Sequence, residues 1–236
     1  MNTPTEFSST LDAARIFFVS YSTLPDGSTQ IEWLGSLIIW LLIAMSMISI
    51  GLIAAALISH RRKIIMPAAT ADAFLRASST GSTNEARSVV AADGSDFARM
   101  AKAAIDTLPL GRSGAVDAAE QTAEECAARR FRSIESLNVL AQISPMIGLF
   151  GTVYGMIVAF QTVSASGGQA DPALLAGGIG TALVTTFWGL IVAIPALLAY
   201  AMVRNWIDAL MAEALEITLR GTAQAASHTS ERGSHS

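Results

Sequence analysis

Threonine hydroxyls recur among glycines and alanines in two uncharged stretches of this 236-residue chain, "SPMIGLFGTVYGMIVAF" and "GTALVTTFWGLIVAIPALLAY". In each stretch the small residues follow one another at steps of four, three and four, so they share one face of a helix. The first strip consists of Gly148, Thr152, Gly155 and Ala159, and the second of Ala182, Thr186, Gly189 and Ala193. Each strip therefore carries one hydroxyl near its middle.

Two interpretations of the strips are open. Small residues let membrane helices approach closely, and a buried threonine can bond a carbonyl one turn earlier, so packing alone explains the pattern. Alternatively, the strips face a narrow central space, where the hydroxyls of Thr152 and Thr186 give a proton or a water molecule a hydrogen-bonding stop. Both interpretations can hold together.

The hydroxyl-bearing neighbours of the second strip, Thr181 and Thr185, are further candidates for the lining of such a space. The residues assigned to helix packing are Gly148, Gly155, Ala182, Gly189 and Pro195. Pro195 removes a helix hydrogen bond, and we expect it to bend its helix.

No Asp, Glu, Lys or Arg occurs in residues 137–165 or 172–203. An ionisable side chain in the membrane is the usual mark of a proton relay. If protons pass along these strips by a titrating group, that group must come from another subunit. Nor does the sequence pair a nucleophile with a base or group metal ligands at a metal-binding spacing. We therefore expect no enzyme activity, no metal and no cofactor.

The elements that carry the strips are long enough to cross a bilayer. Residues 33–59, 137–165 and 172–203 are free of charged side chains, and each exceeds the roughly 20 residues that a membrane helix requires. The whole chain is 52% hydrophobic and 14% charged, against roughly 25% charged residues in soluble domains. These numbers predict an all-α membrane protein with three transmembrane helices.

Basic residues follow the first span (Arg61, Arg62, Lys63), precede the second and end the third. Because such clusters stay in the cytoplasm, residues 1–32 are expected in the periplasm, 60–136 in a cytoplasmic helical region, 166–171 in a periplasmic turn, and 204–236 in the cytoplasm. Helix-forming residues on the cytoplasmic side predict that the second and third spans continue there as long helices, with a disordered tail from Thr222.

Three smaller features of the sequence concern the start of the third span, the basic cluster after the first span and the single cysteine. Asp171 and Pro172 predict the start of the third span, as N-cap and first helical residue. The basic cluster at residues 61–63 either fixes topology alone or also binds anionic lipid. Cys126, the only cysteine, cannot form an intramolecular disulfide and is interpreted as an ordinary helix residue.

On "SPMIGLFGTVYGMIVAF" and "LAGGIGTALVTTFWGLIVAIPALLAY", with the turn that contains Asp171, the chain resembles the MotA/TolQ/ExbB proton-channel family over residues 135–205. Three spans and a large first cytoplasmic loop resemble its ExbB/TolQ branch. The resemblance implies a multi-pass protein of the bacterial inner membrane, a pentamer of this subunit around the single spans of two ExbD/TolR-like partner chains, and no nucleic-acid partner.

In that family the partner's membrane aspartate carries the proton, and the threonines that correspond to Thr152 and Thr186 lie alongside it. The absence of an intramembrane carboxylate is then expected. The chain departs from many ExbB and TolQ members, which have a glutamate at the position of Thr181. This chain therefore lacks any contribution that the glutamate makes to proton access or to the choice of ion.

The leading hypothesis is thus the channel-scaffold subunit of a proton-driven inner-membrane motor that transmits energy across the periplasm. The alternative is a structural membrane scaffold whose strips serve only oligomer packing, without ion conduction. A solute transporter is a weaker third, because three spans without an inverted repeat or intramembrane charge offer little with which to bind a substrate.

Overall fold

The computed structural model describes residues 21–23, 29–31, 33–165 and 172–233. They divide into two compact units, which we call the membrane unit (the described residues of 1–53 and 136–200) and the polar unit (the described residues of 54–135 and 201–236). The predicted turn at 166–171, with Asp171, and most of the predicted periplasmic segment 1–32 lie outside the described residues.

Three long helices carry the membrane unit: α2 (Trp33–Ser59), α7 (Arg112–Ala165) and α8 (Pro172–Gly233). Each contains a stretch that is long and apolar enough to cross a membrane. The predicted fold class, all-helical with three candidate spans of which the second and third are extended, is confirmed. Pro145 and Pro195 lie inside α7 and α8 without ending them, and the bend expected at Pro195 stays a prediction.

A short hairpin precedes α2, and the sequence reading did not include it. Strand β1 (Tyr21–Thr23) pairs antiparallel with β2 (Thr29–Ile31), so that Tyr21 lies opposite Ile31. The two strands are separated by "LPDGS", a composition that favours a turn.

The interior of the membrane unit combines a few large apolar side chains with many small ones, and other large apolar side chains lie on its surface. Leu137 and Ala141 of α7 pack with Ala196 of α8, and Leu52 and Ile53 of α2 join this cluster. Large apolar side chains such as Met146 and Leu198 are more than half exposed. An apolar exterior over an interior rich in small residues is typical of helices packed within lipid.

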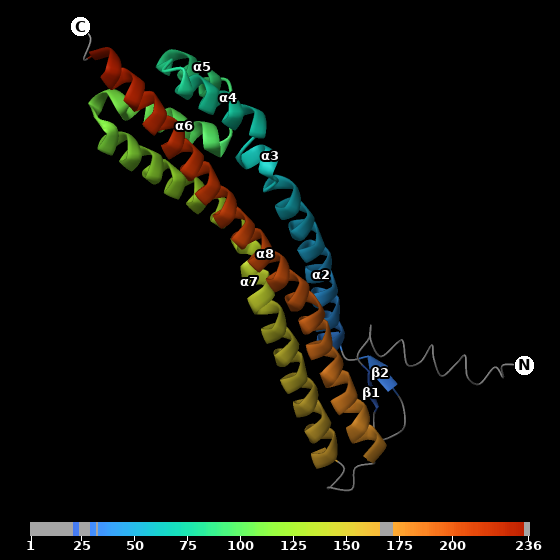
Figure 1. Cartoon of the computed structure of the whole chain (residues 1–236). Coiled ribbons are helices and arrows are strands. Elements are labelled where there is room, and N and C mark those ends of the chain that lie inside the picture. Colours follow the sequence, from blue (N-terminus) through green and yellow to red (C-terminus); the bar gives the residue numbers. More distant parts are fainter. Residues whose placement is uncertain (1–20, 24–28, 32, 166–171, 234–236) are drawn as a thin grey trace, which may run out of the picture. The chain divides into compact units, whose positions relative to one another are not determined.

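The polar unit adds a group of short helices to the ends of the long ones (Figure 1). They are α3 (Arg62–Ile65), α4 (Ala68–Ser79), α5 (Thr83–Ala91), α6 (Asp96–Thr107) and the 3₁₀ turn η1 (Leu108–Leu110). Gly81 and Gly111 adopt positive φ angles of 70° and 123°, which glycine tolerates without strain. Both lie in segments rich in Gly, Ser and Pro, "SSTGSTNEA" and "LPLGRSG", and this composition favours a break between helices.

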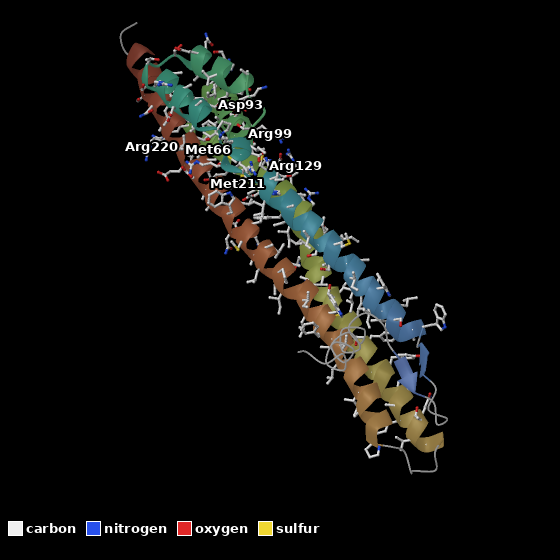
Figure 2. The ribbon with its side chains drawn as sticks, turned by 90° about the vertical axis from the view of Figure 1, so that its right-hand side faces the viewer. Met66, Asp93, Arg99, Arg129, Met211 and Arg220 are labelled. Carbon is white, nitrogen blue, oxygen red and sulfur yellow. The ribbon has the colours of Figure 1, made fainter. Side chains whose placement is uncertain are left out.

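Aromatic and methionine side chains fill the interior of this unit. Phe74 of α4 and Phe97 of α6 meet edge to face, with ring centroids 5.6 Å apart. Met66 and Met211, labelled in Figure 2, are both buried. Cys126 is buried too, and burial, followed by the nearby charge of Asp96, raises the pKa of its thiol to about 11.

The structure corrects the prediction of a disordered tail. Helix α8 continues through Gly233, although the sequence predicts disorder from Thr222 onward. Thr222 and Ala225 are buried, so this part of the helix has tertiary contacts that a polar composition does not reveal. The alanines of "TAQAAS" also favour a helix on their own, and the prediction of disorder is wrong for residues 222–227.

Candidate ion pathway between two membrane helices

The two small-residue strips face each other across α7 and α8. A Cβ atom added at Gly148 would lie 2.9 Å from the carbonyl oxygen of Thr185 and 3.0 Å from Cα of Thr186. One added at Gly189 would lie 2.8 Å from the carbonyl oxygen of Ser144. Because these neighbours are backbone atoms, no side chain fits at either glycine, and the two helices meet backbone to backbone.

The strips continue in register toward the other end of the pair. A Cβ atom at Gly155 would lie 2.8 Å from Cβ of Ala182, and one at Gly178 would lie 2.9 Å from Cβ of Ala159. Gly148, Gly155, Ala182 and Gly189 thus all lie at the contact between α7 and α8. Pro195, the fifth residue assigned to packing, is exposed in this chain.

The sequence reading missed one glycine at this contact. A Cβ atom at Gly151 would lie 2.6 Å from Cβ of Thr185 and closer still to its hydroxyl oxygen. Gly151 was outside the strip read from Gly148 and Thr152, yet steps of three and four from Gly148 through Gly151 to Gly155 place it on the same helix face. The spacing in "GLFGTVYG" was the signal that could have identified it.

Thr185 lies between the helices, with 2% of its surface exposed. Its hydroxyl oxygen is 2.7 Å from the carbonyl oxygen of Ala182 in its own helix and 3.0 Å from that of Gly148 in α7. Both carbonyls accept, so the single hydroxyl hydrogen is shared between them. The hydroxyl of Thr185 therefore links α8 to α7.

Thr186 is next in the chain, and its hydroxyl has the opposite surroundings. Its oxygen is buried and has no hydrogen-bond partner among the described residues. A buried polar atom without a partner costs roughly 1–3 kcal/mol, and such atoms are rare in folded proteins. Of the two strip hydroxyls, this one therefore has unused hydrogen-bonding capacity within the described structure.

Thr152 lies on a more open surface. Its hydroxyl donates to the carbonyl oxygen of Leu149 at 2.7 Å, and its side chain is partly exposed. It lies at the end of a shallow groove along α7 that is lined by Thr152, Val153, Met156, Ile157, Phe160, Gln161 and Ser164. Within the described structure no hydrogen bond joins the hydroxyls of Thr152 and Thr186.

The remaining candidate, Thr181, lies in α8 four residues before Thr185, and its side chain is outside the described set. The candidate path is therefore described by Thr152, Thr185 and Thr186 alone. A threonine hydroxyl can pass or accept a hydrogen bond, but it does not ionise at neutral pH. With no charged residue in 137–165 or 172–203, this helix pair can line a proton path and cannot by itself bind and release the proton.

Comparison with known proteins agrees with this geometry. A sequence model of the MotA/TolQ/ExbB proton channel family matches residues 95–225. The chain is 43% identical over 83 residues to the biopolymer transport protein exbB1 of Vibrio cholerae, a match that covers 35% of this chain and 36% of that protein. It is 46% identical over 76 residues to the Tol-Pal system protein TolQ of Haemophilus influenzae, covering 29% and 33%.

A third relative is the biopolymer transport protein ExbB of Neisseria gonorrhoeae, 49% identical over 73 residues, which are 30% of this chain and 33% of the relative. In all three cases the match spans about a third of the relative's length. The family match is longer: it takes in most of α7 and α8 and reaches back to the start of α6.

Proposed function

The chain belongs to the MotA/TolQ/ExbB proton channel family, and on this premise we propose that it is the channel-scaffold subunit of a proton-motive-force-driven motor in the bacterial inner membrane. It works with a single-span ExbD/TolR-like subunit and transmits energy across the periplasm. The observation that carries the proposal is an uncharged helix pair, held backbone to backbone by glycines, that contains the buried and unpartnered hydroxyl of Thr186.

In this proposal the two helices supply a wall and the partner supplies the charge. A membrane aspartate of the partner's span takes up and releases the proton, and the hydroxyls of Thr152 and Thr186 offer it hydrogen bonds as it passes. Thr185 and the glycines keep the wall in place. The wall of this chain has no charge of its own, because residues 137–165 and 172–203 contain no charged side chain.

The proposed assembly is a pentamer of this chain around two partner spans. Its N-terminus lies in the periplasm, and the polar unit and C-terminus lie in the cytoplasm. This orientation is supported by Arg61, Arg62 and Lys63 after the first span and by Arg129, Arg130 and Arg132 before the second, because basic residues beside short membrane segments favour the cytoplasmic side.

The test is partner-dependent proton flux into liposomes that contain the chain with its partner subunit. Thr186→Val keeps the shape of the side chain and removes the hydroxyl, so we expect flux to fall at least tenfold while the assembly stays intact by size-exclusion chromatography. Thr152→Val is expected to act in the same direction. Thr186→Ser restores a hydroxyl and should recover most of the flux.

Thr162→Val is the matched control. Thr162 is also a threonine of α7, lies beyond Ala159 at the end of the first strip, and has its hydroxyl bonded to the carbonyl of Val158, so its loss should leave flux unchanged. Full flux in both Thr152→Val and Thr186→Val would contradict the assignment of these two residues. An intact assembly that conducts no protons with any partner would favour the alternative function, a structural membrane scaffold.

A further inference from the structure

A pocket of about 350 Å³ lies in the polar unit where α2 ends. It is lined by Ala56, Leu57, His60, Arg61, Arg62, Met202, Val203 and Trp206. These residues come from the last turn of α2, from His60 and Arg61 after it, from the start of α3 and from α8. The pocket thus lies at one end of a candidate membrane span, and the ends of a span are where lipid headgroups lie.

The walls of the pocket are apolar and accessible. Leu57 is 55% exposed and Met202 is 68% exposed. Trp206 is also about half exposed, and its indole nitrogen donates to the carbonyl oxygen of His60 at 3.0 Å. A tryptophan with an apolar face and a bonded N–H is typical of a membrane interface.

One cation at the rim is uncommitted. The guanidinium of Arg62 is paired with Glu213 of α8. Arg61 is exposed and makes no ion pair among the described residues. Arg61 is therefore free to bind an anion at the edge of the apolar walls.

Buried contacts fix the backbone that carries Arg61. His60 is buried, with its Nδ1 2.8 Å from the carbonyl oxygen of Ala56 and its Nε2 3.1 Å from the hydroxyl of Ser133. Since a carbonyl only accepts, Nδ1 must donate. Arg130 adds a bond from its guanidinium to the carbonyl oxygen of Ser59 at 2.9 Å. The pocket is thus held in place before any ligand binds.

We propose that this pocket binds an anionic glycerophospholipid, with part of an acyl chain against Leu57, Met202 and Trp206 and the phosphate on the guanidinium of Arg61. A guanidinium matches the geometry of a phosphate with two parallel hydrogen bonds. Such a lipid brings an apolar chain and an anion in one molecule at the depth where α2 ends. A second copy of this chain would have to supply a carboxylate beside an apolar side chain to fit equally well.

The proposal requires that the chain spans a membrane, which its family membership supports, and does not require that it conducts protons. It is tested on the purified full-length chain by native mass spectrometry, titrated with dioleoyl-phosphatidylglycerol. We expect tighter binding than for dioleoyl-phosphatidylcholine. The comparison with glycerol 3-phosphate, which has no acyl chain, separates a lipid site from a site for a free anion.

Arg61→Ala should weaken phosphatidylglycerol binding about fivefold, because one basic side chain near a membrane surface contributes about 1 kcal/mol. Arg61→Lys should retain most of the binding. Met202→Ser should weaken it too, and because Met202 is largely exposed this variant is expected to fold. Lys102→Ala removes an exposed cation of α6 that does not line the pocket, and it should bind like the unmodified chain.

The proposal would be overturned if phosphatidylcholine bound as tightly as phosphatidylglycerol, or if glycerol 3-phosphate did. It would also be overturned if both Arg61→Ala and Met202→Ser bound phosphatidylglycerol as tightly as the unmodified chain. A Leu57→Cys variant that cross-links two copies regardless of added lipid would overturn it too, since a second chain would then occupy the pocket. Normal proton flux in a variant that no longer binds lipid would leave the proposed function standing.

Discussion

Thr185 and Thr186 are adjacent in the chain, but their hydroxyls have different roles in the contact between α7 and α8. The hydroxyl of Thr185 is shared between two carbonyls, one of them in the facing helix. The hydroxyl of Thr186 is buried without a partner among the described residues. A neutral hydrogen bond contributes about 1 kcal/mol to stability, whereas an unpaired buried polar atom subtracts from it.

Replacement of each threonine by valine should therefore separate stability from flux. Thr185→Val removes the side-chain hydrogen bond from α8 to the Gly148 carbonyl of α7, and we expect the melting temperature, followed by circular dichroism in detergent, to fall by several degrees. Thr186→Val removes an unpaired atom and should leave the melting temperature unchanged or slightly raised, although we expect it to lower the proton flux. A lower melting temperature for Thr186→Val than for Thr185→Val would show that these roles are reversed.

Helices α7 and α8 approach each other most closely at their glycines, and Gly151 is the residue that admits Thr185. Gly151→Ala would place a methyl group in space that Thr185 already fills, and overpacking of this kind costs roughly 1–3 kcal/mol. We expect reduced thermal stability in detergent and a weaker assembly by size-exclusion chromatography.

Gly51→Ala in α2 is the matched control for this substitution. Nothing lies within 4 Å of a Cβ atom added at Gly51, and alanine is the better helix former by up to about 1 kcal/mol. This variant should be as stable as the unmodified chain or more so. If the two variants lost stability equally, the cause would be the loss of glycine itself and not the contact between α7 and α8.

Segments that are far apart in the sequence meet in the polar unit around one arginine. Arg130 of α7 pairs with Asp96 of α6 at 2.8 Å, and these side chains are only 19% and 6% exposed. The same guanidinium bonds the carbonyl oxygen of Ser59 at the end of α2. Three parts of the chain thus depend on a single side chain.

Arg130→Ala would leave the carboxylate of Asp96 buried without its cation, which typically costs 3–5 kcal/mol. We expect a large drop in melting temperature, followed by circular dichroism, and a partial recovery when Asp96→Asn is added. The pair Arg87–Asp106 has the same 2.8 Å separation, but both side chains are 44% exposed, so Arg87→Ala should cost at most about 1 kcal/mol. Equal losses in the two single variants would contradict the buried role of Arg130.

The sequence predicted the features that depend on composition and on helical spacing. The first predicted span coincides with α2, since a bilayer-length segment without charges has few alternatives. The glycines of the strips lie at the contact between α7 and α8, because residues three or four positions apart share a helix face, whereas the role of the strips in an ion path stays a prediction. Gly81 and Gly111 ended helices where turn-forming residues gather.

Features that depend on the neighbouring element were missed. Spacing cannot decide which of Thr185 and Thr186 bonds the facing carbonyl, because that depends on the rotation of one helix against the other. The end of α8 packs against α4: Gly221 lies so close to the ring of Phe74 that a Cβ atom added at Gly221 would overlap it. This contact is between residues far apart in the sequence, so spacing along α8 cannot predict it. The pocket beside Arg61 combines residues of α2 and α8 that are about 145 positions apart.

The side chain of Thr185 fills the space that a side chain at Gly151 would need, and this limits which substitutions the two helices can accept together. Bulk at one position is tolerated only if it is absent from the other, so the two residues form one compatibility rule between α7 and α8. A chimera that takes α7 from one relative and α8 from another can violate this rule even when each helix packs without overlap in the protein from which it was taken. The two helices should be exchanged as a pair.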